Sequence, residues 1–276
     1  MKKYAVDPEL IYRYNRVTPL IMKKWFKDYI WFILYSGAVV GAISFTVGNL
    51  DYDWQWNSIP AYVVSIQNGL KPGPLLNGVY VTVQISLVSI VFAFLFGLIS
   101  ALLRMSDSFI ARLISYGYVE SIRNTPLIVQ IFFMYFAVAP IFNISAFASA
   151  VTALSLFEGA YLSEIIRAGI LSIRKGQWEA AWSLGLGRFQ TYRYVILPLA
   201  MRRVLPPLTG QGVSLIKDSA LVSTISIYDL TMVGQSIVSD TFLSFEVWFT
   251  VAALYLMMTV PLSLLSGHVE RKFAVH

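Results

Sequence analysis

Residues 78–103 read GVYVTVQISLVSIVFAFLFGLISALL, a run that contains no Asp, Glu, Lys or Arg. A helix needs about 20 mostly apolar residues to cross the roughly 30 Å hydrocarbon layer of a membrane. The whole chain agrees with this stretch, because 57% of its 276 residues are hydrophobic and only 13% are charged. A soluble domain usually carries about 25% charged residues. The sequence therefore predicts an integral membrane protein.

Further apolar segments follow the same pattern and predict an all-α, polytopic transmembrane bundle of about six spans. Besides residues 78–103, the expected spans are about 29–48, 113–140, 146–166, 198–222 and 246–266. The Thr125-Pro126 step predicts a kink in the third of the six, since proline lacks a backbone donor and clashes with the preceding turn. Pro206, Pro207, Gly210 and Gly212 predict an irregular, broken region in the fifth.

The lysines and arginines predict how the chain is oriented. Basic residues gather in residues 1–28, beside Arg104 and Arg112, in 167–203 and in the tail at Arg271 and Lys272. The connections near 141–145 and 223–245 have none, and 49–77 has only Lys71. Cytoplasmic loops carry the excess of Lys and Arg, so this alternation predicts six spans with both termini in the cytoplasm. The net charge of +6 is explained in this way, without a nucleic-acid-binding surface.

Several classes of site are excluded by residue content. The chain has no cysteine, which excludes disulfides and cysteine-based metal sites. The only histidines, His268 and His276, lie in the last nine residues, so a histidine-dependent hydrolase or zinc enzyme is hard to build and we expect no metal site. The polar, basic first 28 residues do not read as a cleavable signal peptide; they predict a tether or an amphipathic interfacial helix. The stretch 51–56, DYDWQW, fits an aromatic belt or a binding-protein contact.

The longest basic connection contains GQWEAAWSLG at residues 176–185. This stretch predicts a short helix in which Glu179 lies in the first turn, favoured by the helix dipole. Gly185 or Gly187 can end that helix with a positive φ. Trp178 and Trp182, four residues apart, share one face, and small Ala180 and Ala181 allow close approach. The residues alone fit either a docking helix or an ordinary interfacial helix.

Family motifs favour docking. Glu179-Ala180-Ala181, three residues, Gly185, nine residues and then Val195-Ile196-Leu197-Pro198 resemble the signature loop of binding-protein-dependent ABC permeases, with Val195 in the isoleucine position. Other stretches are similar to the polar amino acid branch (histidine, glutamate, glutamine, arginine): 123–130 RNTPLIVQ, with Asn124 replacing glycine, 159–167 GAYLSEIIR, 173–178 IRKGQW and 214–221 SLIKDSAL. The resemblance covers about residues 75–270, and the additional N-terminal span is a departure from it.

The resemblance implies a type I ABC importer permease fold, with an importer domain at 78–270 and a coupling loop at about 171–197. The basic segment 1–28 and the additional span and outer loop, 29–77, would precede that domain. Coupling to the ATPase would involve Gln177, Trp178, Glu179, Ala180, Ala181, Trp182 and Gly185. None of the nine lysines is followed by Ser or Thr, so the chain has no P-loop. We therefore expect a transporter subunit rather than an enzyme.

The same resemblance implies the partners and the cellular location. This chain would bind no cofactor itself, while ATP and Mg would bind to a cytoplasmic ATPase dimer. The other expected partners are a second permease copy or a sibling permease, an extracytoplasmic solute-binding protein and membrane lipid. The expected function is ATP-driven import of a polar amino acid (glutamate, glutamine, aspartate or a basic amino acid) across the bacterial cytoplasmic membrane.

Ionisable residues inside a membrane usually face a bundle interior or a pathway. Glu158, about 18 Å along the 146–166 helix at 1.5 Å per residue, and Lys217 and Asp218 are the main candidates for contact with solute. Ser219 and Tyr161 are weaker ones. The alternative is a buried structural ion pair among these charges. Glu164 and Arg167 are expected only to pair with each other near the end of their helix.

Two competing functions belong to other classes. A self-sufficient secondary transporter driven by an ion gradient would show inverted repeats with paired broken helices. The sequence shows one candidate break, near 206–212, and no counterpart. A membrane-embedded hydrolase or sensor would need a histidine-based constellation or an output domain, and neither is evident in the sequence.

Overall fold

The computed structural model describes residues 27–42, 44–46, 48, 52–65 and 71–273. It divides the chain into two compact units, Met1–Trp54 and Gln55–His276. The first unit contains the helix Lys27–Thr46, which is long and apolar enough to cross a membrane, as the sequence predicts. Residues 1–26, for which the sequence offers a tether or an interfacial helix, and Asp51 lie outside the described residues.

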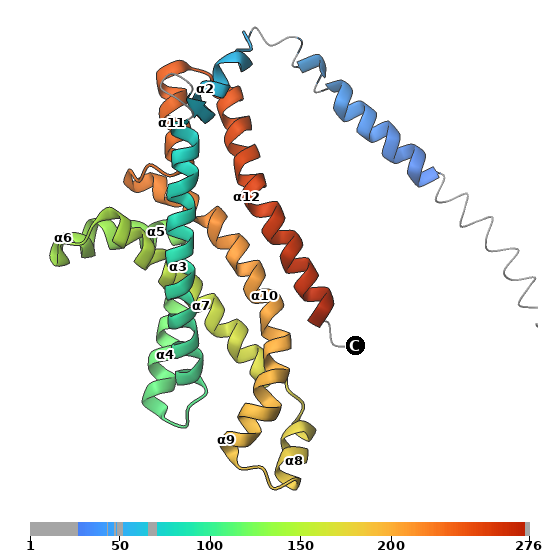
Figure 1. Cartoon of the computed structure of the whole chain (residues 1–276), viewed down its shortest axis with the longest axis vertical. Coiled ribbons are helices and arrows are strands. Elements are labelled where there is room, and N and C mark those ends of the chain that lie inside the picture. Colours follow the sequence, from blue (N-terminus) through green and yellow to red (C-terminus); the bar gives the residue numbers. More distant parts are fainter. Residues whose placement is uncertain (1–26, 43, 47, 49–51, 66–70, 274–276) are drawn as a thin grey trace, which may run out of the picture. The chain divides into compact units, whose positions relative to one another are not determined.

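The second unit is almost entirely helical, and its elements follow one another closely along the chain (Figure 1). Its helices and strands are α2 (Ile59–Val63), β1 (Val64–Ser65), β2 (Lys71–Pro72), α3 (Pro74–Arg104), α4 (Phe109–Arg123), α5 (Leu127–Phe132), α6 (Ala139–Phe142), α7 (Ala146–Leu171), α8 (Lys175–Ser183), α9 (Arg188–Thr191), α10 (Leu197–Asp218), α11 (Leu230–Thr241) and α12 (Ser244–Phe273). 3-10 helices lie at Trp56–Ser58 and Ser219–Ile225, and π-helical segments at Phe133–Val138 and Tyr192–Ile196. The two strands form a small antiparallel hairpin in which Val64 pairs with Pro72.

The closest helix pair is α3 with α7, which forms the centre of the unit. Small residues line this contact, as is usual where membrane helices approach closely. A Cβ atom built on Gly97 would lie 2.7 Å from Cβ of Leu162 and 3.0 Å from the carbonyl oxygen of Gly159. Hydroxyls add polar contacts, since Ser163 donates to Ser100 over 3.0 Å. The α3–α7 pair is therefore the rigid frame on which the other helices pack.

The expected span at 113–140 is more strongly bent than a kinked helix. Its halves, Phe109–Arg123 and Leu127–Phe142, meet at 108°. Pro126 begins the second half because it cannot donate to the preceding turn. The amide of Gln130 holds the corner by donating to the carbonyl oxygens of Ile122, over 2.8 Å, and Thr125, over 2.9 Å.

The predicted break in the fifth span is wrong in position. Helix α10 runs without interruption through Pro206 and Pro207, and the chain departs from α-helix only after Asp218. Each proline removes one backbone donor, and packing of α10 against α7 and α12 keeps the remaining helix in place. The turn occurs at Ser226, whose φ is 60°, and α11 then follows at a 50° bend.

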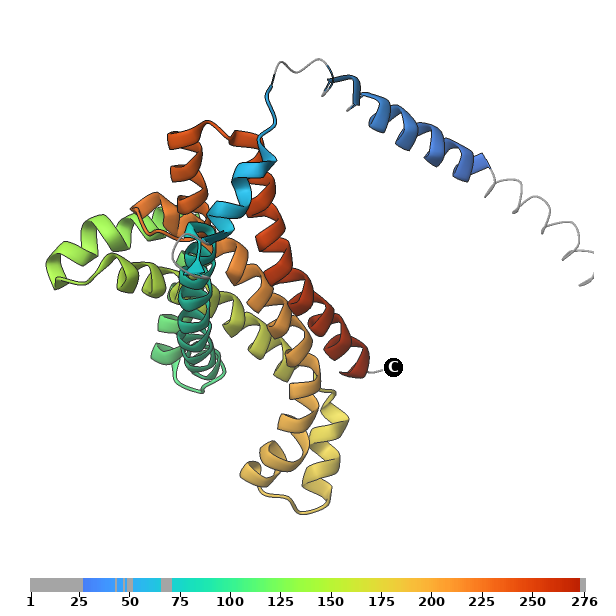
Figure 2. The ribbon, with the colours of Figure 1, turned by 45° about the horizontal axis from the view of Figure 1, so that its top comes forward.

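Among the described residues, four helices are long and apolar enough to cross a membrane, or six spans if each bent pair counts as one. The all-α fold with about six spans is thus confirmed. Figures 1 and 2 both place α2 and α11 at one end of the second unit and the α8–α9 segment at the other. Two sites are therefore separated along the bundle, a pair of carboxyl groups inside it and a short helix at its end.

Candidate functional site

Glu158 lies near the middle of α7 and is completely buried. Gln211 on α10 donates its side-chain N–H to Glu158 Oε2 over 2.5 Å. The second carboxyl oxygen, Oε1, has no hydrogen-bond partner among the described residues. An unsatisfied buried oxygen costs roughly 1–3 kcal/mol.

Asp218, at the last position of α10, interacts electrostatically with Glu158. Two helices therefore bring together two carboxyl groups that are 60 residues apart in sequence. Among the described residues, neither forms a salt bridge with a lysine or arginine side chain. The structural ion pair that the sequence also allowed is therefore not formed in this conformation.

The other predicted solute contacts are placed differently. Lys217 is exposed and contributes only an electrostatic interaction with Asp218. Ser219 is fully buried, and its hydroxyl donates to the carbonyl oxygen of Ile216 over 2.7 Å. Tyr161 packs on Phe157, with ring centroids 5.1 Å apart, and lies under the guanidinium of Arg123 at 5.3 Å. The structure thus groups Glu158 with Asp218 and leaves Ser219 and Tyr161 in local contacts.

Gln211 is the member of this group that the sequence analysis did not single out. It lies seven residues before Asp218, which is two helical turns, so the same face of α10 carries both side chains. A polar residue at that spacing inside a predicted span was the available signal.

The expected pairing of Glu164 with Arg167 is confirmed, with Arg167 Nη2 and Glu164 Oε2 2.7 Å apart. Arg104, at the end of α3, also binds the Glu164 carboxyl. One acid therefore joins two arginines at the end of the bundle that carries α8. This cluster ties α3 to α7 well away from the Glu158–Asp218 pair.

Helix α8 ends at a left-handed glycine, as its sequence predicts. Gly185 has a φ of 75°, its N–H donates to the carbonyl oxygen of Trp182 over 2.9 Å, and Leu186 N–H donates to that of Ala181 over 3.2 Å. This pair of bonds is a Schellman motif, which satisfies the last carbonyls of a helix. The other candidate, Gly187, instead caps the start of α9 with a φ of −68°.

The predicted coupling residues divide between a buried and an exposed face of α8. Trp178 and Trp182 are neighbours, with centroids 6.2 Å apart, but Trp178 is half-buried against Tyr192 at 5.1 Å. Ala181 is also buried and packs within this chain. Trp182 has 57% of its surface exposed. The exposed members are Gln177, Glu179, Ala180, Trp182 and Gly185.

Two apolar side chains extend this exposed face, and the sequence analysis did not name them. Leu184, the residue that follows α8, and Phe189 on α9 are each 80% exposed. The α8–α9 segment, which lies at one end of the second unit (Figure 2), thus carries the exposed apolar side chains Trp182, Leu184 and Phe189. The hydrophobic residues in an otherwise polar loop were the signal for it.

Comparison with known proteins identifies the family to which this chain belongs. Residues 93–275 match the family described as binding-protein-dependent transport system inner membrane components. The chain belongs to this permease family. The match includes α7, α8 and α10, and so covers both the carboxyl pair and the short helix α8.

Individual relatives are permeases of amino acid transporters. The glutamine transport system permease protein GlnP of Escherichia coli K12 is 38% identical over 231 residues, which are 82% of this chain and all of that protein. The L-cystine transport system permease protein TcyB of Bacillus subtilis is 41% identical over 203 residues, 72% of this chain and 86% of the relative. A solved amino acid ABC transporter with histidines is 35% identical, with a TM-score of 0.72, and covers 80% of this chain and all of its own.

These likenesses confirm the family resemblance and the type I importer permease fold. The protein is an amino acid ABC importer permease with several membrane helices, and it is a transporter subunit rather than an enzyme. The motif 179–185 and the dimeric arrangement expected from it are consistent with this family.

Proposed function

We propose that the permease moves an amino acid across the bacterial cytoplasmic membrane, and that the ammonium group of this amino acid contacts Asp218 on the way. The carboxyl pair, which forms no salt bridge with a lysine or arginine among the described residues, carries this proposal. Two adjacent carboxyl groups repel each other when both are ionised, so a bound cation is favoured beside them. Asp218 is the solute contact because it is partly exposed, whereas Glu158 is completely buried behind it.

The proposed substrate class rests on the chemistry of the carboxyl pair and on the solutes for which the relatives are named. An ammonium group is common to all amino acids, so this pair recognises the class and not one side chain. The relatives are named for glutamine and L-cystine, which are polar amino acids. We therefore propose a polar amino acid as the solute, delivered by an extracytoplasmic solute-binding protein.

The driving force comes from a separate ATPase dimer that docks on α8, with ATP and Mg bound by that partner. The exposed Trp182, Leu184 and Phe189 supply a compact apolar contact, and aromatic side chains dominate the energy of many interfaces. The end of the bundle with α8 carries the basic residues of 167–203, so it lies in the cytoplasm, together with both termini. Two permeases would form the pathway, either two copies of this chain or one copy with a sibling.

The carboxyl pair is tested with Asp218→Asn in the complete transporter, measuring solute uptake and solute-stimulated ATP hydrolysis in proteoliposomes. We expect uptake to fall at least tenfold while assembly and basal ATP hydrolysis persist. Asp240→Asn, at an exposed acid on α11, is the matched control and should transport normally. Unchanged uptake by Asp218→Asn would remove this residue from the pathway.

Orientation is tested with single cysteines, which report cleanly because the native chain contains none. Ser183→Cys on α8 should react with a membrane-impermeant maleimide only in inverted vesicles, and Ser239→Cys on α11 only in right-side-out ones. Labelling of Ser183→Cys from outside would overturn the docking of the ATPase on α8. Uptake by the purified chain alone under an ion gradient would instead favour a secondary transporter.

A further inference from the structure

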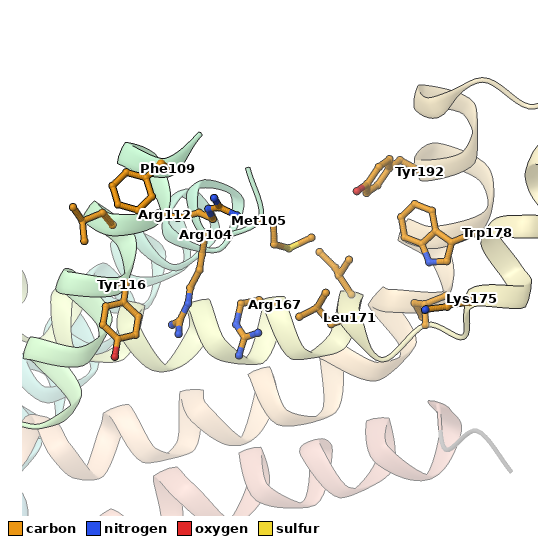
Figure 3. Close-up of a pocket in the computed structure, with 13 residues that line it drawn as sticks. Arg104, Met105, Phe109, Arg112, Tyr116, Arg167, Leu171, Lys175, Trp178 and Tyr192 are labelled. Atoms are coloured by element: carbon orange, nitrogen blue, oxygen red, sulfur yellow. The ribbon is translucent and has the colours of Figure 1, made fainter. Parts of the chain in front are cut away.

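A large cationic pocket lies at the α8 end of the bundle, away from the carboxyl pair. Its volume is about 790 Å³. Figure 3 shows Arg112 and Phe109 of α4 on one side, Trp178 and Tyr192 on the other, and Arg167 of α7 between them. The pocket thus separates the start of α4 from helix α8, and no transport step described above uses it.

The pocket is strongly positive. Arg104, Arg112, Arg167 and Lys175 line it, and no Asp or Glu is among the lining residues. Glu164 neutralises only part of this charge through Arg104 and Arg167. Within the described residues, Arg112 and Lys175 form no salt bridge. An anionic group is therefore the ligand that the pocket favours, and guanidinium groups match phosphate oxygens well.

The pocket continues directly into an apolar surface. Phe109 and Leu113 on α4 are exposed by 70% and 57% of their surface, and Leu171 at the end of α7 by 62%. All three line the pocket. Ile110 and Ile114 extend the same surface along α4, with 68% and 61% exposed. A soluble anion would leave this surface in contact with water, whereas an anionic amphiphile would cover it.

Several residues that line the pocket lie at helix ends, where a membrane interface is expected. Arg104 ends the apolar helix α3, and Arg167 lies one turn before the end of α7. Tyr116 and Trp178 also line the pocket, and such aromatic side chains are enriched at the level of lipid headgroups. Basic pockets between membrane helices at this level bind anionic headgroups.

We propose that this pocket binds the phosphate headgroup of an anionic phospholipid, whose acyl chains lie along α4. A lipid bound there bridges the start of α4 and the start of α8. It therefore stabilises the position of α8. In the orientation proposed above, this lipid would belong to the cytoplasmic leaflet; the binding of the lipid does not depend on that orientation.

The test uses the complete transporter after delipidation in detergent. Dioleoylphosphatidylglycerol, dioleoylphosphatidylcholine or inorganic phosphate is added, and native mass spectrometry measures what the transporter retains. The variant Arg112→Gln/Lys175→Gln removes the two unpaired cations of the pocket. Arg271→Gln/Lys272→Gln, at exposed residues of α12, removes the same charge elsewhere. We expect the pocket variant to bind phosphatidylglycerol at least tenfold more weakly and the control to bind as the native protein does.

Distinct outcomes overturn the proposal. Equal affinity for phosphatidylglycerol and phosphatidylcholine, or equal binding by the two double variants, would show that the pocket holds no anionic lipid. Competition by millimolar inorganic phosphate as effective as by the lipid would show a site for a soluble anion. The pocket variant could also retain lipid as the native protein does but no longer co-purify with the ATPase. That result would assign the pocket to the ATPase contact and would not contradict the proposed function.

Discussion

At the scale of single residues, Gln211 decides how Glu158 is held inside the bundle. Its amide supplies the one hydrogen bond that the buried carboxyl receives from a side chain in the described residues. Asp218 lies two turns further along the same helix, so α10 carries both the group that fixes Glu158 and the group next to it. A change at Gln211 therefore alters the carboxyl pair without removing either acid.

Gln211→Leu should lower the stability of the transporter and also its uptake. Loss of this hydrogen bond leaves a buried carboxyl oxygen unsatisfied, which costs about 1–3 kcal/mol. We expect a lower thermal midpoint of the purified complex and an uptake rate reduced several-fold. The matched change is Gln235→Leu, at an exposed glutamine of α11. Native stability and uptake in Gln211→Leu would show that this bond contributes nothing.

Sequence reasoning located Glu158 and Asp218 through one physical rule, the high cost of an ionisable group in a membrane. That rule does not say which partner such a group meets. The contact between Glu158 and Gln211 depends on how α7 packs against α10, and the contacts of Ser219 with Ile216 and of Tyr161 with Arg123 depend on local geometry. The sequence therefore predicted Glu158 and Asp218 as a pair of candidates, while the contact of Glu158 with Gln211 could not be predicted from it.

At the scale of helices, the α3–α7 pair depends on the absence of side chains at its crossing. Gly97→Ala adds a methyl group 2.7 Å from Leu162 Cβ. Overpacking of this kind costs about 1–3 kcal/mol, so the thermal midpoint of the complex should fall. Gly117→Ala is the control, because an added Cβ there meets nothing within 4 Å and alanine favours a helix by about 0.5–1 kcal/mol over glycine. Equal midpoints for the two variants would contradict this packing.

Helix α8 allows docking to be separated from folding, because its two tryptophans face different surroundings. Trp182→Ala truncates an exposed side chain, whereas Trp178→Ala removes the partner of Tyr192 inside the chain. Hot-spot truncations cost 2 kcal/mol or more. Trp182→Ala should therefore weaken ATPase co-purification roughly thirtyfold or more without changing permease stability, and Trp178→Ala should lower permease stability.

The comparison of Trp182 with Trp178 is informative only if Trp182 is part of the interface. Native ATPase retention by Trp182→Ala together with native retention by Leu184→Ala would place the docking surface elsewhere. Phe242→Ala, at a residue 81% exposed at the start of the α11–α12 connection, provides the control for loss of an exposed aromatic side chain.

Helix boundaries show where sequence rules compete. The prolines at 206 and 207 suggested a break, but tertiary contacts of α10 preserved the helix. The Pro126 corner was foreseen as a kink, and Gln130 makes it a bend of 108° by binding two carbonyls there. Helix α11 was expected to be part of a connection, because its twelve residues are too few and too mixed in polarity to indicate a span.

At the scale of the whole molecule, the chain consists of a permease unit and an additional N-terminal unit. The unit Gln55–His276 contains the carboxyl pair, α8 and the cationic pocket. At the end of this unit that carries α2, Glu246 accepts a hydrogen bond from the Gln55 N–H over 2.7 Å, and Ile59 packs in the cluster around Leu230. Alignment with the whole of the E. coli glutamine permease leaves 18% of this chain unmatched.

Removal of residues 1–54 should therefore leave a functional permease. The deletion takes away one span and leaves five, and in the proposed orientation the new terminus would lie outside. The basic residues beside Arg104 and within 167–203 are retained, and these are the charges that set orientation in a membrane. We expect Ser183→Cys in the shortened chain to be labelled only from the cytoplasmic side, and uptake by the reconstituted transporter to stay within about twofold of native. Inverted labelling, or failure to assemble with the ATPase, would show that the N-terminal unit directs insertion of the permease unit.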